Sequence, residues 1–111
     1  MADGDDGDDA LRARAEAGDV DAMSALGELV AKRPGGQSVW AEAARWWRVA
    51  AERGHADAQF HLAIFCLQGK GVRQDDREAE RWCRQSAAQG HARAQQQLQA
   101  MLEQAEEDRT H

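Results

Sequence analysis

The chain has little of what many protein classes depend on. Its 111 residues include two cysteines, one proline, two phenylalanines and no tyrosine. Two cysteines without CxxC spacing do not make a zinc site or a thioredoxin-type redox site. Buried free thiols are expected, and a Cys66–Cys83 bridge is the alternative. The longest apolar run, residues 62–67, is far shorter than the roughly 20 residues that cross a membrane. We therefore expect no metal site, no cofactor and no membrane span.

Two further absences narrow the fold and the location. No segment alternates apolar and polar residues or is rich in β-branched residues, so no strand is predicted. The first residues, MADGDDGDD, lack the basic and apolar regions of a signal peptide, and the expected location is the cytoplasm. The alanine-, arginine- and glycine-rich composition is compatible with a GC-rich bacterial source.

The net charge of −6 is concentrated at the two ends of the chain. Five aspartates and two glycines fall within the first nine residues, a composition typical of disorder, and residues 1–8 are predicted to form an acidic disordered tail. Residues 10–102 are nearly balanced, with thirteen Lys or Arg against eleven Asp or Glu. Binding to nucleic acid needs clustered positive charge, so no nucleic-acid partner is expected.

A repeat of 36 residues runs through the chain. Residues 18–29, 54–65 and 90–101 align with Gly, Ala and Leu at fixed positions, and residues 42–48 align with 78–84. Apolar residues within these segments recur at helical spacing, which predicts two helices per repeat. Hairpins of this kind bury their apolar faces only by stacking on one another. The predicted helices cover residues 9–17, 21–32, 39–53, 57–68, 76–89 and 93–107.

The repeat predicts a single domain over residues 9–108. It consists of a capping helix at residues 9–17, repeat one at 18–53, repeat two at 54–89 and a C-terminal capping helix at 90–108. Gly54 and Gly90 are expected to end helices, and Asp57 to start one.

Four tryptophans lie in the two repeats. Trp46 and Trp82 share one repeat position and are predicted to be core residues. Trp40 and Trp47 have no aromatic equivalent in repeat two, where Asp76 and Cys83 stand, and one of them is expected to lie partly at the surface.

Several short motifs recur together. They are Ala-x-x-x-Leu-[Gly/Ala], the sequence GKGVRQD at residues 69–75, Ala-x-x-Trp at 79–82, and Gly-His-Ala at 90–92. Jointly they resemble the Sel-one-like repeat (SLR) family, a relative of the tetratricopeptide repeats. The resemblance implies an all-α fold, an α/α solenoid with a right-handed superhelix of about three helical hairpins. It also implies a non-catalytic adaptor or scaffold that binds a protein or peptide, and it places a histidine at the helix entries of His55 and His91.

The related tetratricopeptide superhelix has the first helix of each hairpin on its concave face. By that resemblance, eight residues are directed into a partner-binding groove. Within them, Phe60, Ile64 and Leu67 form an apolar stripe at i, i+4 and i+7. The stripe fits two interpretations: core covered by neighbouring helices, or an exposed patch for a partner or for a second copy in a homodimer. The eight are Ser24, Glu28, Asp57, Phe60, Ile64, Leu67, Gln68 and Gln96.

Arginines recur at two repeat positions of the second helices. Stacking would align them in a basic ladder that attracts an acidic partner or the acidic tail. The alternative is a solvated face balanced by neighbouring glutamates. The ladder consists of Arg12, Arg45, Arg48, Arg81 and Arg84.

A small thiol-dependent or β-lactamase-like hydrolase is the alternative from another class. Arg81 and Arg84 flank Cys83, and their charges would lower the pKa of an exposed thiol; Cys66 is the second candidate nucleophile. No nucleophile, base and orienting group share a recognisable spacing, so no catalytic residue is assigned and no enzyme activity is expected.

Overall fold

The computed structural model describes residues 3–110, with side chains from residue 7 to residue 109. Six α-helices follow one another in this part of the chain, which contains no strand. The predicted all-α class is confirmed. The helices are α1 (Asp3–Glu16), α2 (Val20–Ala31), α3 (Gln37–Glu52), α4 (Ala56–Gln68), α5 (Asp76–Ala88) and α6 (Ala92–Thr110).

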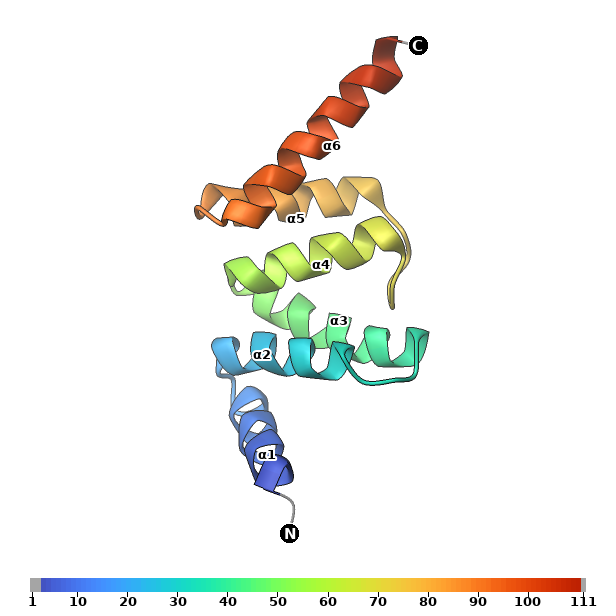
Figure 1. Cartoon of the computed structure of the whole chain (residues 1–111). Coiled ribbons are helices and arrows are strands. Elements are labelled where there is room, and N and C mark those ends of the chain that lie inside the picture. The colour runs from blue at the N-terminus through green and yellow to red at the C-terminus, as the bar shows by residue number, and fades with distance from the viewer. Residues whose placement is uncertain (1–2, 111) are drawn as a thin grey trace.

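The helices stack along an elongated molecule of 59 × 29 × 18 Å. Packing is most extensive between α2 and α3 and between α4 and α5, and each helix also contacts the next along the chain. Figure 1 shows the termini at opposite ends of the stack, with the later part of α6 projecting beyond it. The molecule is thus a short α/α solenoid, as the 36-residue period predicts.

The helices that open each repeat start at side-chain caps. The Asp19 carboxylate accepts a hydrogen bond from the Ala22 amide of α2 at 3.1 Å. The His55 imidazole does the same for the Ala58 amide of α4 at 3.2 Å. The prediction that Asp57 starts α4 is therefore wrong, because the cap is His55 and Asp57 lies within the first turn.

Small residues and leucines fill the space between the stacked helices. Ala22, Ala58 and Ala94 are fully buried, and so are Leu26 and Leu62. Helices approach closely where the side chain is a methyl group, and the leucines pack in the layer between them.

The tryptophans of repeat one agree with the prediction except at Trp46. Trp40 is half-buried, as expected for one of Trp40 and Trp47. Trp47 is a core residue, 2% exposed, and its indole Nε1 donates a hydrogen bond to the Ser24 carbonyl at 3.1 Å. A Cβ on Gly27 would overlap this indole, so the glycine leaves the space that the ring occupies. Trp46 is only half-buried, whereas Trp82, at the same repeat position, is buried as predicted.

The N-terminal helix starts earlier than expected. Residues 3–8, predicted as part of a disordered tail, belong to α1. Aspartates near the start of a helix interact favourably with its macrodipole, which accounts for the early start. Residues 1–2 of the predicted tail lie outside the described residues.

Candidate functional site

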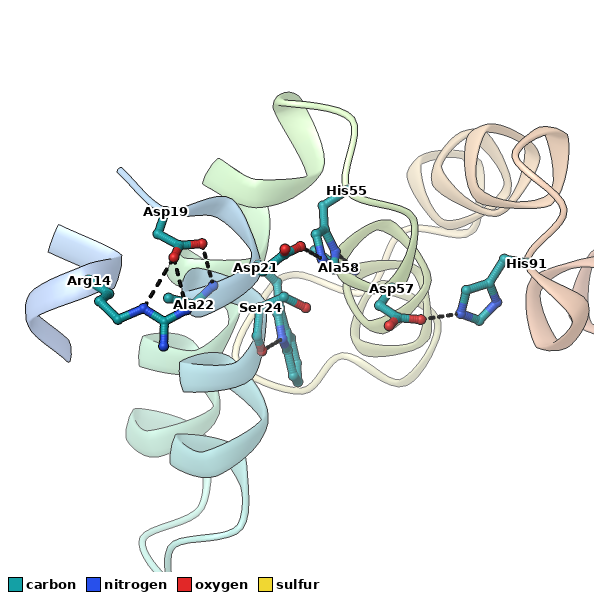
Figure 2. A network of polar contacts seen from close by, with 10 residues as sticks. Arg14, Asp19, Asp21, Ala22, Ser24, His55, Asp57, Ala58 and His91 are labelled. Atoms are coloured by element: carbon teal, nitrogen blue, oxygen red, sulfur yellow. Dashed lines mark hydrogen bonds and ion pairs between the residues drawn. The ribbon is translucent and has the colours of Figure 1, made fainter. Parts of the chain in front are cut away.

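Histidines join each repeat to the one before it. His55, the cap of α4, places Nε2 3.0 Å from the Asp21 carboxylate of α2. His91 caps α6 by accepting from the Ala94 amide through Nδ1, and its Nε2 lies 2.6 Å from Asp57 of α4. Figure 2 shows Asp21 beside His55 and Asp57 beside His91. One ring nitrogen accepts and the other donates, as in a neutral imidazole protonated at Nε2.

The sequence contained a signal for these two contacts, Asp21–His55 and Asp57–His91, which are called the histidine joints. Asp21 and Asp57 are separated by the same 36 residues as His55 and His91. The predicted helix-entry role of the histidines is confirmed, but the pairing across repeats was missed. At the N-terminal end, Asp19 stands in place of the histidine, and its hydrogen bonds from the Ala22 amide and Arg14 lower the pKa of its carboxyl.

An open groove of about 420 Å³, called here the α4–α6 groove, lies between these two helices. Ile64 and Phe65 in it are half-buried, while Arg93 and Gln96 are exposed. The groove therefore combines apolar surface with a cation and amides at its edge. Its lining residues are Phe60, His61, Ile64, Phe65, Arg93, Gln96 and Gln97.

Phe60 lies beneath the groove surface and is only 5% exposed. The His91 ring stacks on it with centroids 5.0 Å apart, and the Arg93 guanidinium lies 5.0 Å from the Phe60 centroid. The start of α6 thus covers this phenylalanine, and the core interpretation holds for it. Ile64 and Leu67 are half-buried, so the predicted stripe is divided between core and surface.

His61 extends the aromatic floor of the groove. Its ring stacks on Trp47 at a centroid distance of 4.7 Å, and Phe65 meets the same indole edge-on at 4.8 Å. Burial lowers the pKa of His61, although the Glu28 carboxylate, 3.2 Å from Nε2, opposes this shift. A neutral His61 follows, and it links α4 to Glu28 of α2.

The remaining predicted groove residues do not form one surface. Ser24 is 3% exposed and lies in the core, where its hydroxyl has no hydrogen-bond partner among the described residues. Glu28 and Asp57 are exposed carboxylates held by His61 and His91. Gln68 and Gln96 are exposed, and of these only Gln96 lines the α4–α6 groove.

The arginine ladder is largely paired with acids. Arg12 lies 3.6 Å from Glu42, and Arg48, one repeat later, lies 2.8 Å from the equivalent Glu78. Arg84 binds Glu80 at 2.9 Å within α5. Of the other two, the Arg81 guanidinium lies 5.5 Å from the centroid of the Trp82 ring, and Arg45 is exposed. The arrangement matches a solvated face on which glutamates balance the arginines, the alternative to a ladder that binds an acidic partner.

The two cysteines are buried free thiols. Burial raises the pKa of both Cys66 and Cys83 to about 11. The condition for activation of Cys83 by its neighbouring arginines, an exposed thiol, is therefore not met. Protonated thiols in the core are poor nucleophiles. Within residues 3–110 no group of three or more His, Cys, Asp or Glu is placed to hold a metal ion, and no helix is long and apolar enough to cross a membrane.

Comparison with known proteins identifies the repeat. The Sel1 repeat family matches at residues 20–55 and again at 56–91, each unit beginning two residues later than the predicted repeat. The chain belongs to the Sel1 repeat family. The SLR resemblance seen in the sequence is thereby confirmed, and with it a fold that generally serves as a non-catalytic scaffold.

Two solved structures share this fold. One is c5321, a protective antigen of uropathogenic Escherichia coli strains with an SLR fold, at 41% identity and a TM-score of 0.75. The other is a Sel1 repeat protein from Oxalobacter formigenes, at 31% identity and a TM-score of 0.64. The alignments cover 79% and 71% of this chain but 19% and 32% of those proteins. No curated protein sequence matches the chain.

Proposed function

We propose that this Sel1 repeat domain is a non-catalytic recognition module that binds a protein or peptide in the α4–α6 groove. The observation that carries the proposal is the groove itself. Ile64 and Phe65 are half-exposed there although the core beneath them is buried, and Arg93 and Gln96 lie beside them. Exposed apolar surface rimmed by polar groups is typical of protein-binding sites. Membership of a family whose members commonly bind proteins supports the same function.

The burial of the thiols argues against the hydrolase alternative. Because the pKa of each cysteine is raised to about 11, alkylation of the native protein at pH 7 should be slow and should accelerate on unfolding. Rapid labelling of the folded protein would reinstate a thiol enzyme. The cytoplasmic location and the lack of a nucleic-acid partner stay predictions.

The test compares two equivalent exchanges of an aliphatic residue for glutamine. Ile64→Gln changes the groove, and Val49→Gln changes the exposed surface of α3, where repeat two already has glutamine at position 85. Proteins captured from source-cell lysate by wild type are identified by mass spectrometry, and their affinity for each variant is then measured by calorimetry. We expect Ile64→Gln to weaken binding about tenfold, as loss of an interface anchor does, and Val49→Gln to leave it unchanged.

Equal binding by both variants would refute recognition through this groove. Capture of the same chain, with a concentration-dependent mass in sedimentation, would favour the homodimer. Circular dichroism and the unfolding midpoint of each variant control for loss of the fold.

A further inference from the structure

A second groove, called here the α5–α6 groove, lies further along α6 and shares Gln97 with the first. It has a volume of about 410 Å³ and is formed by the end of α4, the start of α5 and the middle of α6. Leu67, Ala100 and Met101 provide its apolar surface, and Leu67, expected in the first groove, lines this one instead. The full lining is Leu67, Asp76, Glu80, Gln97, Ala100, Met101, Gln104, Ala105 and Asp108.

The charged residues of this groove are all acidic. Asp76, Glu80 and Asp108 line it, and no lysine or arginine does so among the described residues. Glu80 has a cation partner in Arg84, at 2.9 Å. Asp76 and Asp108 accept hydrogen bonds from the amides of Gln74 and Gln104, which carry no charge. Two carboxylates thus stand beside apolar surface with neutral hydrogen-bond donors.

One repeat earlier, the equivalent place is filled by the chain itself. Residues 69–72 turn back after Gly69, which is left-handed at φ +68°, and cover the start of α3. The Gly71 amide donates to Gln37 Oε1 at 2.6 Å, and its backbone lies so close to Trp40 that a Cβ would overlap it. The Lys70 ammonium lies 5.0 Å from the centroid of the Trp40 ring, and Val72 packs against the core.

Two substitutions open this place in the last unit. Ala105 stands at the position of Gly69, and since a residue with a Cβ disfavours the left-handed turn, α6 continues to Thr110. Asp76 stands at the position of Trp40. The surface equivalent to the one that Lys70 and Val72 cover on α3 is therefore open on α5, and a carboxylate replaces the aromatic ring beneath the lysine.

We propose that the α5–α6 groove binds an extended segment of a partner protein that carries a lysine or arginine and, two residues later, an aliphatic residue. The cation lies beside Asp76 in place of Lys70, and the aliphatic side chain lies on Leu67 and Met101 in place of Val72. Charge complementarity selects this partner, because the groove holds carboxylates and no cation of its own. This surface borders the α4–α6 groove at Gln97, but the proposal rests on residues that line only the α5–α6 groove.

The probe is a capped synthetic peptide with the sequence of residues 68–74, QGKGVRQ. It is titrated into the ¹⁵N-labelled full chain and followed by NMR. We expect saturable shifts of the backbone amides of Leu67, Asp76, Glu80 and Met101, which weaken as salt is added. Asp76→Lys should raise the dissociation constant about fivefold, the effect of one exposed ion pair.

Exchanging the two charges distinguishes a specific contact between the peptide lysine and Asp76 from nonspecific electrostatic attraction. A peptide with Lys70→Glu should bind wild type more weakly but recover affinity for the Asp76→Lys protein. Glu52→Lys, an equal charge change at the far end of α3, should have no effect. The proposal is overturned by shifts confined to Ile64, Arg93 and Gln96, by equal losses with Glu52→Lys and Asp76→Lys, or by no shift at millimolar peptide. A dimer of the protein alone that protects these amides would instead assign the groove to a second copy.

Discussion

Repeat one and repeat two have the same helix pair but fill the space between its two helices with different pairs of residues. In repeat one, Gly27 on the first helix faces Trp47 on the second, and the indole lies where a Cβ of Gly27 would be. In repeat two the same two positions hold Ala63 and Cys83, both fully buried. Gly27 leaves the volume that the large Trp47 ring occupies, whereas Ala63 and Cys83 are both small. The size of the residue at one of these positions therefore limits the size of the residue at the other.

The first prediction breaks this pairing and carries the largest effect. Trp47→Cys should lower the free energy of unfolding by about 3–5 kcal/mol because it leaves a cavity. Gly27→Ala alone should cost about 1–3 kcal/mol through overlap with the indole. With Trp47→Cys present, Gly27→Ala recreates repeat two and should be neutral or stabilising by up to about 1 kcal/mol, since alanine favours helix. Urea unfolding of the four proteins measures the coupling, and additive effects would contradict it.

The second prediction compares the two joints. His91→Ala removes a helix cap and the contact with Asp57, so it should lower the unfolding free energy by about 1–2 kcal/mol. His91→Asn retains a cap but not the reach to Asp57, and should cost about 0.2–1 kcal/mol. The same pair of variants at His55 should give similar values in thermal unfolding. Equal losses for Ala and Asn would mean that the cap contributes nothing.

The third prediction uses the equivalent ion pairs of the arginine ladder. Arg48 and Glu78 are 2.8 Å apart and Glu78 is partly buried, whereas Arg12 and Glu42 are 3.6 Å apart and more exposed. Glu78→Gln should cost about 0.5–1 kcal/mol, and Glu42→Gln about 0.2 kcal/mol or less. The difference should shrink in high salt. A larger loss for Glu42→Gln would show that geometry does not rank these pairs.

The smallest effect is a pH dependence present in repeat two only. His61 stands where repeat one has Ala25, and burial lowers its pKa below the usual 6.5. As pH falls through 6.5 the unfolded chain takes up the proton first, so the stability present above that pH is lost as pH approaches the lowered pKa. His61→Ala should flatten the dependence of unfolding free energy on pH between 7.5 and 5. An unchanged slope would show that His61 does not cause the pH dependence.

The order of the helices and the repeat were predictable from sequence because the period is carried by many residues. Alanine and leucine at fixed positions indicate a packing layer, and five of the six predicted helix starts lie within two residues of the observed ones. Phe60 was harder to place, because the residues that cover it, His91 and Arg93, belong to the next repeat. The joints were missed for the same reason. Periodicity describes one unit well, whereas contacts between units depend on two positions that are 34 residues apart.

The histidine joints have a consequence for how such a chain can grow. A unit of 36 residues that starts at His55 carries the histidine for the junction behind it and the aspartate for the junction ahead. A tandem duplication of that unit would thus bring both halves of a working contact, with no further substitution. Position 93 holds arginine instead of aspartate, so α6 offers a following histidine a cation where the earlier helices offer an acceptor. Arg93 thus stands where Asp21 and Asp57 supply the carboxylates of the two joints.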